Sequence, residues 1–417
     1  MKRDIAIIGG GAAGLFAAAI AAGEYNRRGV TPSVVILEKM ERCGRKIALT
    51  GKGRCNLTNT KPWEEFSRHI HPKNIFLKNA FYAMSNLKTM AFFEDMGLPL
   101  TVERGERVFP ESMRAADVTR VMTDYLKNAG VEICTGAEVT GVSYLNAEEG
   151  FRIATGGEAG EVTARKVILA TGGLSYPATG STGAGYGFAR ELGHTVTPCF
   201  PSLTALIPLN YREDLHGISL KNVSVKLLVN KNVAAEEFGD LDFTPGGIEG
   251  PIGFKVSRTG VWSLINGQKV ELVLDMKPAI TPQQLAARIK RELEALPGSV
   301  RGRSSRIDLI LPKLLPKALI KPFSAVHKEM TAGSLAEALK SWKFSIHSYV
   351  GYERCVITAG GISLADVSQK TMESKRVPGL YFAGEVLDLD GDTGGYNLQI
   401  AFSTAALAAA SAVAALG

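Results

Sequence analysis

The feature that most constrains the fold of this 417-residue chain is a glycine-rich turn between an apolar run and a small-residue helix. Residues 4–8 read DIAII, the turn spans residues 9–14, and an Ala-rich helical stretch runs from Leu15 to Gly23. Val34 to Leu37 is a second short apolar run, typical of a buried parallel strand. The sequence therefore predicts a βαβ unit and an α/β fold.

The turn itself reads Gly-Gly-Gly-Ala-Ala-Gly, which has the spacing G-x-G-x-x-G. Gly9 permits the tight turn, Gly11 lets the backbone approach a pyrophosphate, and Gly14 allows close helix–strand packing. The helix N-terminus presents free N–H groups to the phosphates. Glu38 ends the second strand, where a carboxylate can accept both ribose hydroxyls of an adenosine. These features predict a dinucleotide site.

A basic, glycine-rich loop follows at residues 44–56, GRKIALTGKGRCN. It can wrap a diphosphate and pass close to a flat ring, and the alternative is a solvated basic loop. Cys55 lies in this loop without a neighbouring base or second cysteine. We therefore interpret it as a packed thiol rather than as a covalent flavin attachment site.

Two later segments also end strands with small residues. Residues 169–173, LATGG, suit a strand end that touches a cofactor. Residues 379–385, GLYFAGE, form a strand that ends at an acid able to hold a ribityl hydroxyl. Residues 394–399, GGYNLQ, then open the last helix, whose N-terminal dipole can stabilise an anionic reduced ring. The alternative is a C-terminal core helix with a glycine hinge.

Composition limits the partners and the compartment. The net charge of +7 favours anionic ligands, but no long Lys/Arg run marks a nucleic-acid tract. Five cysteines with no C-x-x-C indicate neither a disulfide framework nor a dithiol centre, which fits a reducing cytoplasm. The apolar run at residues 5–8 is too short for a signal peptide. The Ala-rich stretch at residues 401–417 is expected to be a core helix rather than a membrane span.

The pattern along the chain predicts three parts. A split α/β domain that carries the dinucleotide site is expected at residues 1–193 and 346–417, with a β-meander at residues 131–170. A strand-like inserted domain is expected at 194–280 and 341–345, and a helical insert at 281–340. Thr281-Pro282 provides an N-cap and a first-turn proline for the first helix of that insert.

Longer stretches make the chain resemble the BaiN-like, or aminoacetone-oxidase-type, family of bacterial FAD-dependent oxidoreductases. The family includes aminoacetone oxidases and 3-dehydro-bile-acid reductases. The matching stretches span nearly the whole chain and are IAIIGGGAAGL, GRKIALTGKGRCNLTN, RVFP, LATGGLSYPATGSTGAGYGFARELGH and TAGGISLADVSQKTMESKRVPGLYFAGEVLDLDGDTGGYNLQIAFSTA. GRCNLTN and GEVLDLDGDTGGYNLQ are more specific than any dinucleotide fingerprint.

The resemblance implies a glutathione-reductase-like, Rossmann-type FAD domain split in sequence, with an inserted β-barrel-like domain and a small helical insert. It implies non-covalent FAD. Together with the strand ends and turns described above, it predicts that FAD contacts Gly9, Gly11, Ala13, Gly14, Glu38, Lys39, Arg45, Lys46, Gly51, Gly53, Asn56, Val139, Ala170, Thr171, Gly172, Gly384, Glu385, Gly395, Asn397 and Leu398. The chain departs from the family at Thr244-Pro245 and at residues 248–251, IEGP, so no substrate role is carried over to that loop.

Two kinds of reaction fit these residues. In the first, NAD(P)H binds transiently and reduces the flavin, whose N5 passes a hydride to an unsaturated or carbonyl-conjugated small molecule. In the second, a small amine is oxidised and O2 reoxidises the ring with release of H2O2. An RNA-binding or RNA-modifying role is a third alternative, but no aromatic-basic recognition motif supports it, so no nucleic-acid partner is expected. No membrane association is expected, and the sequence does not indicate an oligomeric state.

Candidates for proton transfer near the ring are few, and the sequence selects none of them as the catalytic group. They are Tyr396, Asn56, Tyr186, Arg107 and His347. The six histidines lack metal-ligand spacing, so no metal is predicted. His69-x-His71 is expected to be a solvated pair on a polar loop.

Overall fold

The computed structural model describes residues 1–297, 302–328 and 330–417, which divide into two compact units. Unit 1 comprises residues 1–200 and 356–417, and unit 2 comprises residues 201–355. The sequence predicts these boundaries at residues 193/194 and 345/346. In the structure both lie later in the chain, at 200/201 and 355/356.

Unit 1 is built on a mixed sheet with the strand order β7-β2-β1-β10-β9-β8. The parallel part contains β7 (Glu132–Thr135), β2 (Val34–Glu38), β1 (Lys2–Ile8), β10 (Val162–Leu169) and β19 (Leu380–Phe382). An antiparallel extension follows, with β9 (Gly150–Thr155) and β8 (Val139–Asn146). The start of β10 pairs with β9 and its end pairs with β19, so the two ends of this strand have different neighbours.

The predicted βαβ unit is confirmed as β1, α1 (Ala12–Arg27) and β2. The predicted meander is wrong at its first strand, because β7 pairs in parallel with β2 and belongs to the main sheet. The four residues of β7, EICT, show the same pattern whether the strand is parallel or antiparallel to its neighbour. The sequence pattern therefore could not tell a parallel strand from part of a hairpin.

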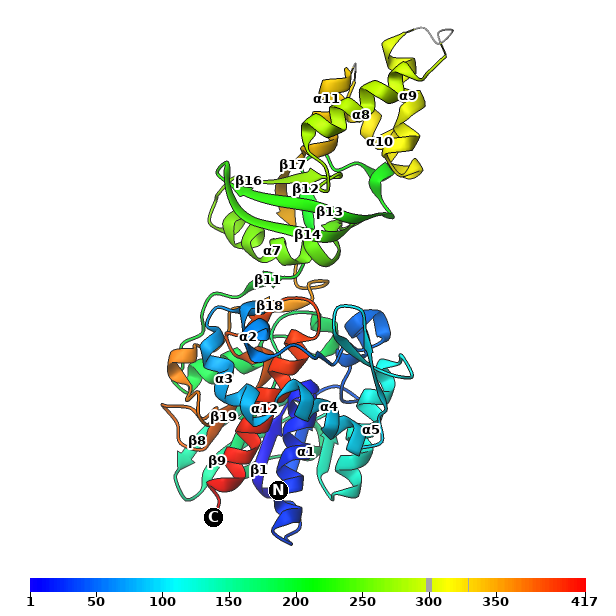
Figure 1. The fold of residues 1–417 in the computed structure, drawn as a ribbon. Coiled ribbons are helices and arrows are strands. Elements are labelled where there is room, and N and C mark those ends of the chain that lie inside the picture. Colours follow the sequence, from blue (N-terminus) through cyan, green and yellow to red (C-terminus); the bar gives the residue numbers. More distant parts are fainter. Residues whose placement is uncertain (298–301, 329) are drawn as a thin grey trace. The chain divides into compact units, whose positions relative to one another are not determined.

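The last helix, α12 (Tyr396–Ala414), packs against α1, and Figure 1 shows the red α12 alongside the blue α1. Both helices are rich in alanine, which allows their backbones to approach closely. By length and hydropathy alone α12 could cross a membrane, but 67% of its most apolar window is buried inside the protein. It is the expected core helix.

The other elements of unit 1 surround this core. The helices are α2 (Trp63–Phe66), α3 (Asn74–Ala83), α4 (Asn86–Asp95), α5 (Ala115–Asn128) and α6 (Ala184–Glu191). Two small sheets join β3 (Thr58–Asn59), β6 (Arg107–Pro110) and β5 (Leu100–Glu103), and β4 (Ile70–His71) with β20 (Asp390–Gly391). The chain passes between the units through β11 (Phe200–Ser202) and close to β18 (Ile357–Ala359).

Unit 2 contains the expected barrel and the expected helices. Six strands close the barrel in the order β12 (Leu206–Pro208), β15 (Gly247–Glu249), β14 (Asn232–Thr244), β13 (Ile218–Val229), β16 (Val270–Asp275) and β17 (Trp342–Tyr349). The helical part is α8 (Pro282–Glu294), α9 (Arg303–Leu314), α10 (Lys317–Val326) and α11 (Ala332–Lys340). Thr281 caps α8 in a reciprocal capping box with Gln284, as its sequence predicts.

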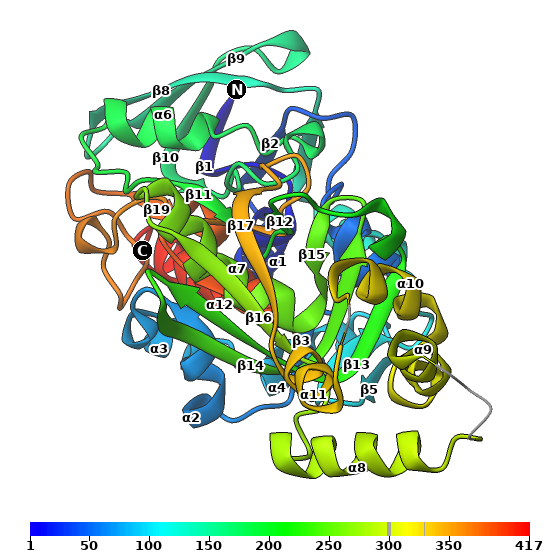
Figure 2. The same cartoon turned by 90° about the horizontal axis from the view of Figure 1, so that it is seen from above.

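One long helix in unit 2 was not expected. Helix α7 (Gly250–Ile265) lies in a stretch that the sequence analysis took as strand-like, and it packs against the barrel strands (Figure 2). Its buried face carries the small residues Gly253, Ser257 and Gly260 at helical spacing. Glycines lower helix propensity, so packing against the barrel, rather than propensity, stabilises this helix.

Candidate cofactor and active site

Two glycines of the turn between β1 and α1 have different roles. Gly14 allows the helix to pack against the strand, and Gly11 leaves space for a ligand. A Cβ on Gly14 would lie 1.8 Å from the Gly9 carbonyl oxygen, so the helix can approach the strand only with glycine there. A Cβ on Gly11 would meet no protein atom within 4 Å. Gly11 is the N-cap of α1, it has no capping side chain, and the first turn contains no acid. The turn therefore offers open space and free N–H groups to a phosphate.

Glu38 lies at the end of β2, facing this turn. Its side chain is buried and accepts hydrogen bonds from the backbone N–H of Gly10 (2.7 Å) and of Met40 (2.8 Å). A carboxylate can accept about four hydrogen bonds, so two remain for hydroxyl groups. The backbone fixes the orientation of this carboxylate before any ligand binds.

The basic loop is anchored by Lys46 and Glu385, whose side chains form a half-buried ion pair with Nζ and Oε2 2.5 Å apart. Lys46 also donates to Ser175, and the other Glu385 oxygen accepts from Ser175 Oγ and from the Thr358 N–H (2.9 Å). Four segments that are distant in sequence therefore meet at one carboxylate. Both Glu385 oxygens have protein partners, so its predicted hydroxyl contact would use their remaining lone pairs.

The other cations in and near the predicted site differ in whether they have hydrogen-bond or ion-pair partners within the protein. Lys39 donates to Thr182 Oγ1 (2.7 Å), and Arg54 pairs with Glu103 (3.0 Å) and lies over the Phe109 ring. Arg45 forms no ion pair within the described residues. It is half-buried, so a bound anion could pair with it away from bulk solvent.

Thr171, just after β10, has a buried hydroxyl group, Oγ1, without a hydrogen-bond partner among the described residues. A buried hydroxyl left without a partner costs about 1–3 kcal/mol, so such groups are normally satisfied by ligand or solvent. Gly384, which follows β19, lies directly against Ala13 of α1 and brings the second strand end to the same place.

The N-terminus of α12 is held by two asparagines. Asn397 accepts from the Gly391 N–H (2.8 Å) and donates to the Gly391 carbonyl (2.8 Å), which fixes the preceding loop. Asn56, with its amide nitrogen donating to the carbonyls of Thr58 and Val108, accepts from the Gly395 N–H (3.0 Å). Gly395 is the uncapped N-cap of the helix. The helix therefore begins at a fixed point with first-turn N–H groups available.

These residues fit FAD. An open glycine turn, an orphaned hydroxyl, a free arginine and two uncapped helix N-termini can hold an anionic dinucleotide, with α1 at the phosphates. All the predicted cofactor residues lie in unit 1, including Val139 at the start of β8. That each of them contacts FAD stays a prediction.

Cys55 and Cys43 lie close to this site but are not nucleophiles. Cys55 is fully buried and Cys43 is nearly so. Burial raises the pKa of each thiol to about 12, and Glu38 adds to the effect at Cys43. Both stay protonated at neutral pH, which agrees with a packed role for Cys55 and with FAD held without a covalent bond.

The candidates for proton transfer are scattered. Tyr396 is buried at the start of α12, and burial raises the pKa of its phenol, followed by repulsion from Asp392, Glu65 and Glu106. Tyr186 is buried in α6, with its hydroxyl 3.5 Å from the Glu385 carbonyl oxygen. Arg107 lies over Phe109, and His347 belongs to unit 2, with Nδ1 3.1 Å from the Ile207 carbonyl oxygen.

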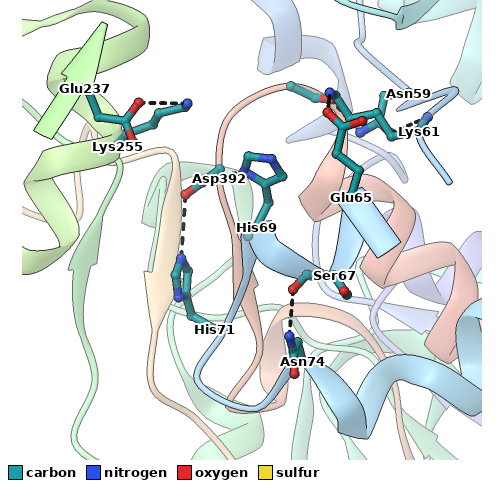
Figure 3. Close-up of polar contacts among 12 residues, drawn as sticks. Asn59, Lys61, Glu65, Ser67, His69, His71, Asn74, Glu237, Lys255 and Asp392 are labelled. Carbon is teal, nitrogen blue, oxygen red and sulfur yellow. Dashed lines mark hydrogen bonds and ion pairs between the residues drawn. The ribbon is translucent and has the colours of Figure 1, made fainter. Parts of the chain in front are cut away.

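The prediction that His69 and His71 form a solvated pair is wrong. Both rings lie on the carboxylate of Asp392, with His69 Nδ1 2.7 Å and His71 Nε2 3.6 Å from its oxygens (Figure 3). Burial alone would raise the pKa of Asp392, but hydrogen bonds from His69 and His71 outweigh it and lower the pKa to about 2. No sequence pattern links residues so far apart, although the GDTGG stretch places the acid directly before α12.

These three side chains are called the acid–histidine cluster below. They do not form a metal centre: within the described residues, no group of three or more His, Cys, Asp or Glu side chains could hold a metal ion. The cluster instead joins an ionised carboxylate to two imidazole rings.

A separate pocket of about 450 Å³ lies beside α3 in unit 1. Its lining combines apolar side chains, such as Phe76 and Leu364, with three lysines, Lys73, Lys370 and Lys375. No acidic side chain lines it. Such a pocket attracts anions.

The comparisons with known proteins agree with a Rossmann-type FAD-binding fold. Residues 3–411 match the model of the HI0933-like protein Rossmann domain family. A 3-dehydro-bile acid delta(4,6)-reductase from Clostridium scindens is 33% identical over 97% of both chains, and a ribosomal RNA dihydrouridine synthase from Haemophilus influenzae is 29% identical over 96% of both. Among solved structures, a 3-ketosteroid-Δ4-(5α)-dehydrogenase from Rhodococcus jostii shares the fold, with a TM-score of 0.50, 14% identity, and coverage of 99% of this chain and 96% of that one.

Proposed function

Because this chain belongs to the HI0933-like Rossmann family and is an FAD-dependent oxidoreductase, we propose that it uses NAD(P)H to reduce a carbon–carbon double bond conjugated to a carbonyl group. This proposal rests on the reactions named for two relatives. A 3-dehydro bile acid with Δ4 and Δ6 bonds is an enone, and a uridine that becomes dihydrouridine loses a double bond conjugated to its C4 carbonyl. Both names describe saturation of the same functional group.

The site geometry supports the same chemistry. The β1–α1 turn and the N-terminus of α12 both lie in unit 1, which supports one dinucleotide site, and no disulfide joins the cysteines of the described residues. When bound, FAD supplies the two-electron step. The chain's residues hold it: Gly11 and α1 at the phosphates, Glu38 at the ribose, and the first turn of α12 at the ring. A cytoplasmic location is part of the proposal, because no disulfide is present among the described cysteines.

The test is anaerobic. The FAD-loaded protein is mixed with NADH or NADPH, and the flavin absorbance near 450 nm is expected to bleach. Addition of 4-androstene-3,17-dione or a uridine-rich RNA transcript is then expected to restore the colour as the double bond is reduced. Bleaching by aminoacetone, with H2O2 formed in air and no response to either nicotinamide, would contradict the proposal and favour an amine oxidase.

A ribosomal RNA substrate is the second candidate, and the lysine-lined pocket favours it. Single-stranded RNA carries one phosphate per nucleotide, and lysines that neutralise phosphates release counterions. Lys73 and Lys370 are exposed at the pocket, whereas Lys375 donates to the Ala365 carbonyl. Their position beside an apolar wall suits a backbone phosphate next to a base.

This candidate predicts RNA binding with a steep salt dependence. The double variant Lys73→Glu/Lys370→Glu is expected to weaken binding of a uridine-rich transcript about tenfold or more and to lower the slope of log K against log salt by about 1–2. Lys127→Glu, at the end of α5, is the matched control. Equal binding by all three proteins would remove the pocket from the RNA interface, and turnover of the steroid alone would favour a small-molecule substrate.

A further inference from the structure

The acid–histidine cluster lies next to the start of the helix that we place at the flavin ring. β4, which ends at His71, pairs with β20, and His71 is opposite Asp390 in that pairing. The Asp392 N–H donates to the His69 carbonyl oxygen (3.0 Å). Asn397, a predicted cofactor residue, donates to the Gly391 carbonyl and, more weakly, to that of Asp392 (3.4 Å). The cluster is thus fixed to α12 by backbone and side-chain bonds.

The two histidines are not equivalent. His69 makes the shorter bond to Asp392, and its ring packs on Tyr396 with centroids 4.6 Å apart. His71 is 36% exposed, and its contact with Asp392 is longer. Nε2 of His71 faces the carboxylate, and Nδ1 has no hydrogen-bond partner among the described residues. His71 can therefore be held by one nitrogen and donate with the other.

Reduction of a conjugated double bond needs a proton as well as a hydride. The hydride adds to the β-carbon, the electron pair of the double bond moves toward the carbonyl, and a proton must reach the α-carbon or the carbonyl oxygen. Tyr396 is a poor donor, because its raised pKa makes its phenol a weak acid. Histidine is the residue that most often transfers protons in enzymes, and the His71 imidazole is held beside a carboxylate.

Building on the reductase function proposed above, we propose that His71 is the catalytic acid that gives this proton to the substrate, and that Asp392 is the positioning residue that holds its ring. The imidazolium loses one proton to the substrate and regains one from solvent, to which it is partly exposed. The bound cofactor supplies the two electrons as hydride. His69 fixes Asp392 from the other side, so that the carboxylate stays aimed at His71.

Other charged side chains, including Glu65 and Glu106, lie close enough to the cluster to interact with it electrostatically. Glu65 interacts with His69 and Arg68, and Asp392 interacts with Tyr396. Glu106 acts on Tyr396. The low pKa of Asp392 keeps this carboxylate ionised at neutral pH, so it presents a negative charge to both imidazole rings.

The experiment separates the two half-reactions by anaerobic stopped flow. The variants are His71→Asn, Asp392→Asn and His69→Asn, with His216→Asn in unit 2 as the matched histidine control. Flavin reduction by the nicotinamide is expected to stay within twofold in all of them. Reoxidation by 4-androstene-3,17-dione, or by the uridine-rich RNA if that is the substrate of the wild type, is expected to slow at least 100-fold in His71→Asn. Asp392→Asn should slow it about tenfold.

Two further measurements separate catalysis from structure. The wild-type reoxidation rate should fall as the pH rises, and His71→Asn should lack this fall. Imidazole added to His71→Ala should restore part of the rate.

The outcomes are distinguishable. If the wild type reduces the substrate and His71→Asn does so at a similar rate, or without change in its pH profile, the assignment of His71 is wrong while the reductase function stands. If neither nicotinamide nor enone acts on the wild-type flavin, the reductase function fails and the assignment fails with it. A loss of flavin reduction in His71→Asn would show a structural role and also overturn the assignment.

Discussion

Replacement of Gly11 by alanine is expected to weaken FAD binding about 100-fold or more while the FAD-free protein stays folded. A Cβ there meets no protein atom, so the fold has no reason to change. It projects into the space where we place the pyrophosphate, and hydrogen bonds to a charged group are each worth about 1.5–3 kcal/mol. The measurements are FAD titration by fluorescence quenching and the thermal midpoint of the apoprotein, which should move by less than about 2 °C.

Two other glycines of α1 make the comparison sharp. Gly14→Ala places a Cβ 1.8 Å from the Gly9 carbonyl oxygen, so β1 and α1 must separate. It should cost about 3 kcal/mol in apoprotein stability and lose FAD as a consequence. Gly23→Ala, near the other end of the same helix, makes only an ordinary contact with the Tyr125 hydroxyl, so it should leave FAD binding unchanged and raise apoprotein stability by up to about 1 kcal/mol. If Gly11→Ala binds FAD as tightly as the wild type, the phosphates do not lie at this turn.

Replacement of Glu385 by alanine is expected to destabilise the protein by about 3 kcal/mol. It leaves the half-buried ammonium of Lys46 without its partner and the Thr358 N–H without its acceptor. An uncompensated buried charge costs more than the ion pair itself contributes. The exposed pair of Arg120 and Asp124 on α5 offers the control, and Asp124→Ala should change stability by less than about 1 kcal/mol.

The double variant Lys46→Met/Glu385→Leu tests this reason. It removes both charges, so it should recover about 2 kcal/mol relative to Glu385→Ala when denaturant midpoints are compared. If the single and double variants are equally unstable, the loss comes from the Thr358 and Ser175 hydrogen bonds rather than from the stranded charge. If Glu385→Ala is as stable as the wild type, the carboxylate is not the junction that we describe.

Features decided by short stretches of chain could be predicted from the sequence. The β1–α1–β2 unit follows from a strand, a glycine turn and a helix that are adjacent in the chain, and the capping box of α8 follows from Thr281 and Gln284. The long resemblance located the family, and with it the split FAD domain. Alternating apolar residues predicted that the inserted domain is rich in strands, but not the bounds of its individual strands.

Features decided by tertiary contacts could not be predicted. Helix α7 carries glycines on its buried face, so its local pattern was read as strand although packing makes it helical. β7 looked like part of a meander because a four-residue strand does not show which neighbour it pairs with. The acid–histidine cluster joins residues 69, 71 and 392, and only the pairing of β4 with β20 brings them together.

The interleaved order of the two units has a consequence for biosynthesis. Unit 2 is one continuous segment, so it can fold as soon as residue 355 has emerged from the ribosome. Unit 1 cannot finish its sheet or cover α1 until β19 and α12 have been made. Its nascent N-terminal half therefore waits with apolar strands exposed, and chaperone dependence and slow folding are expected to reside there.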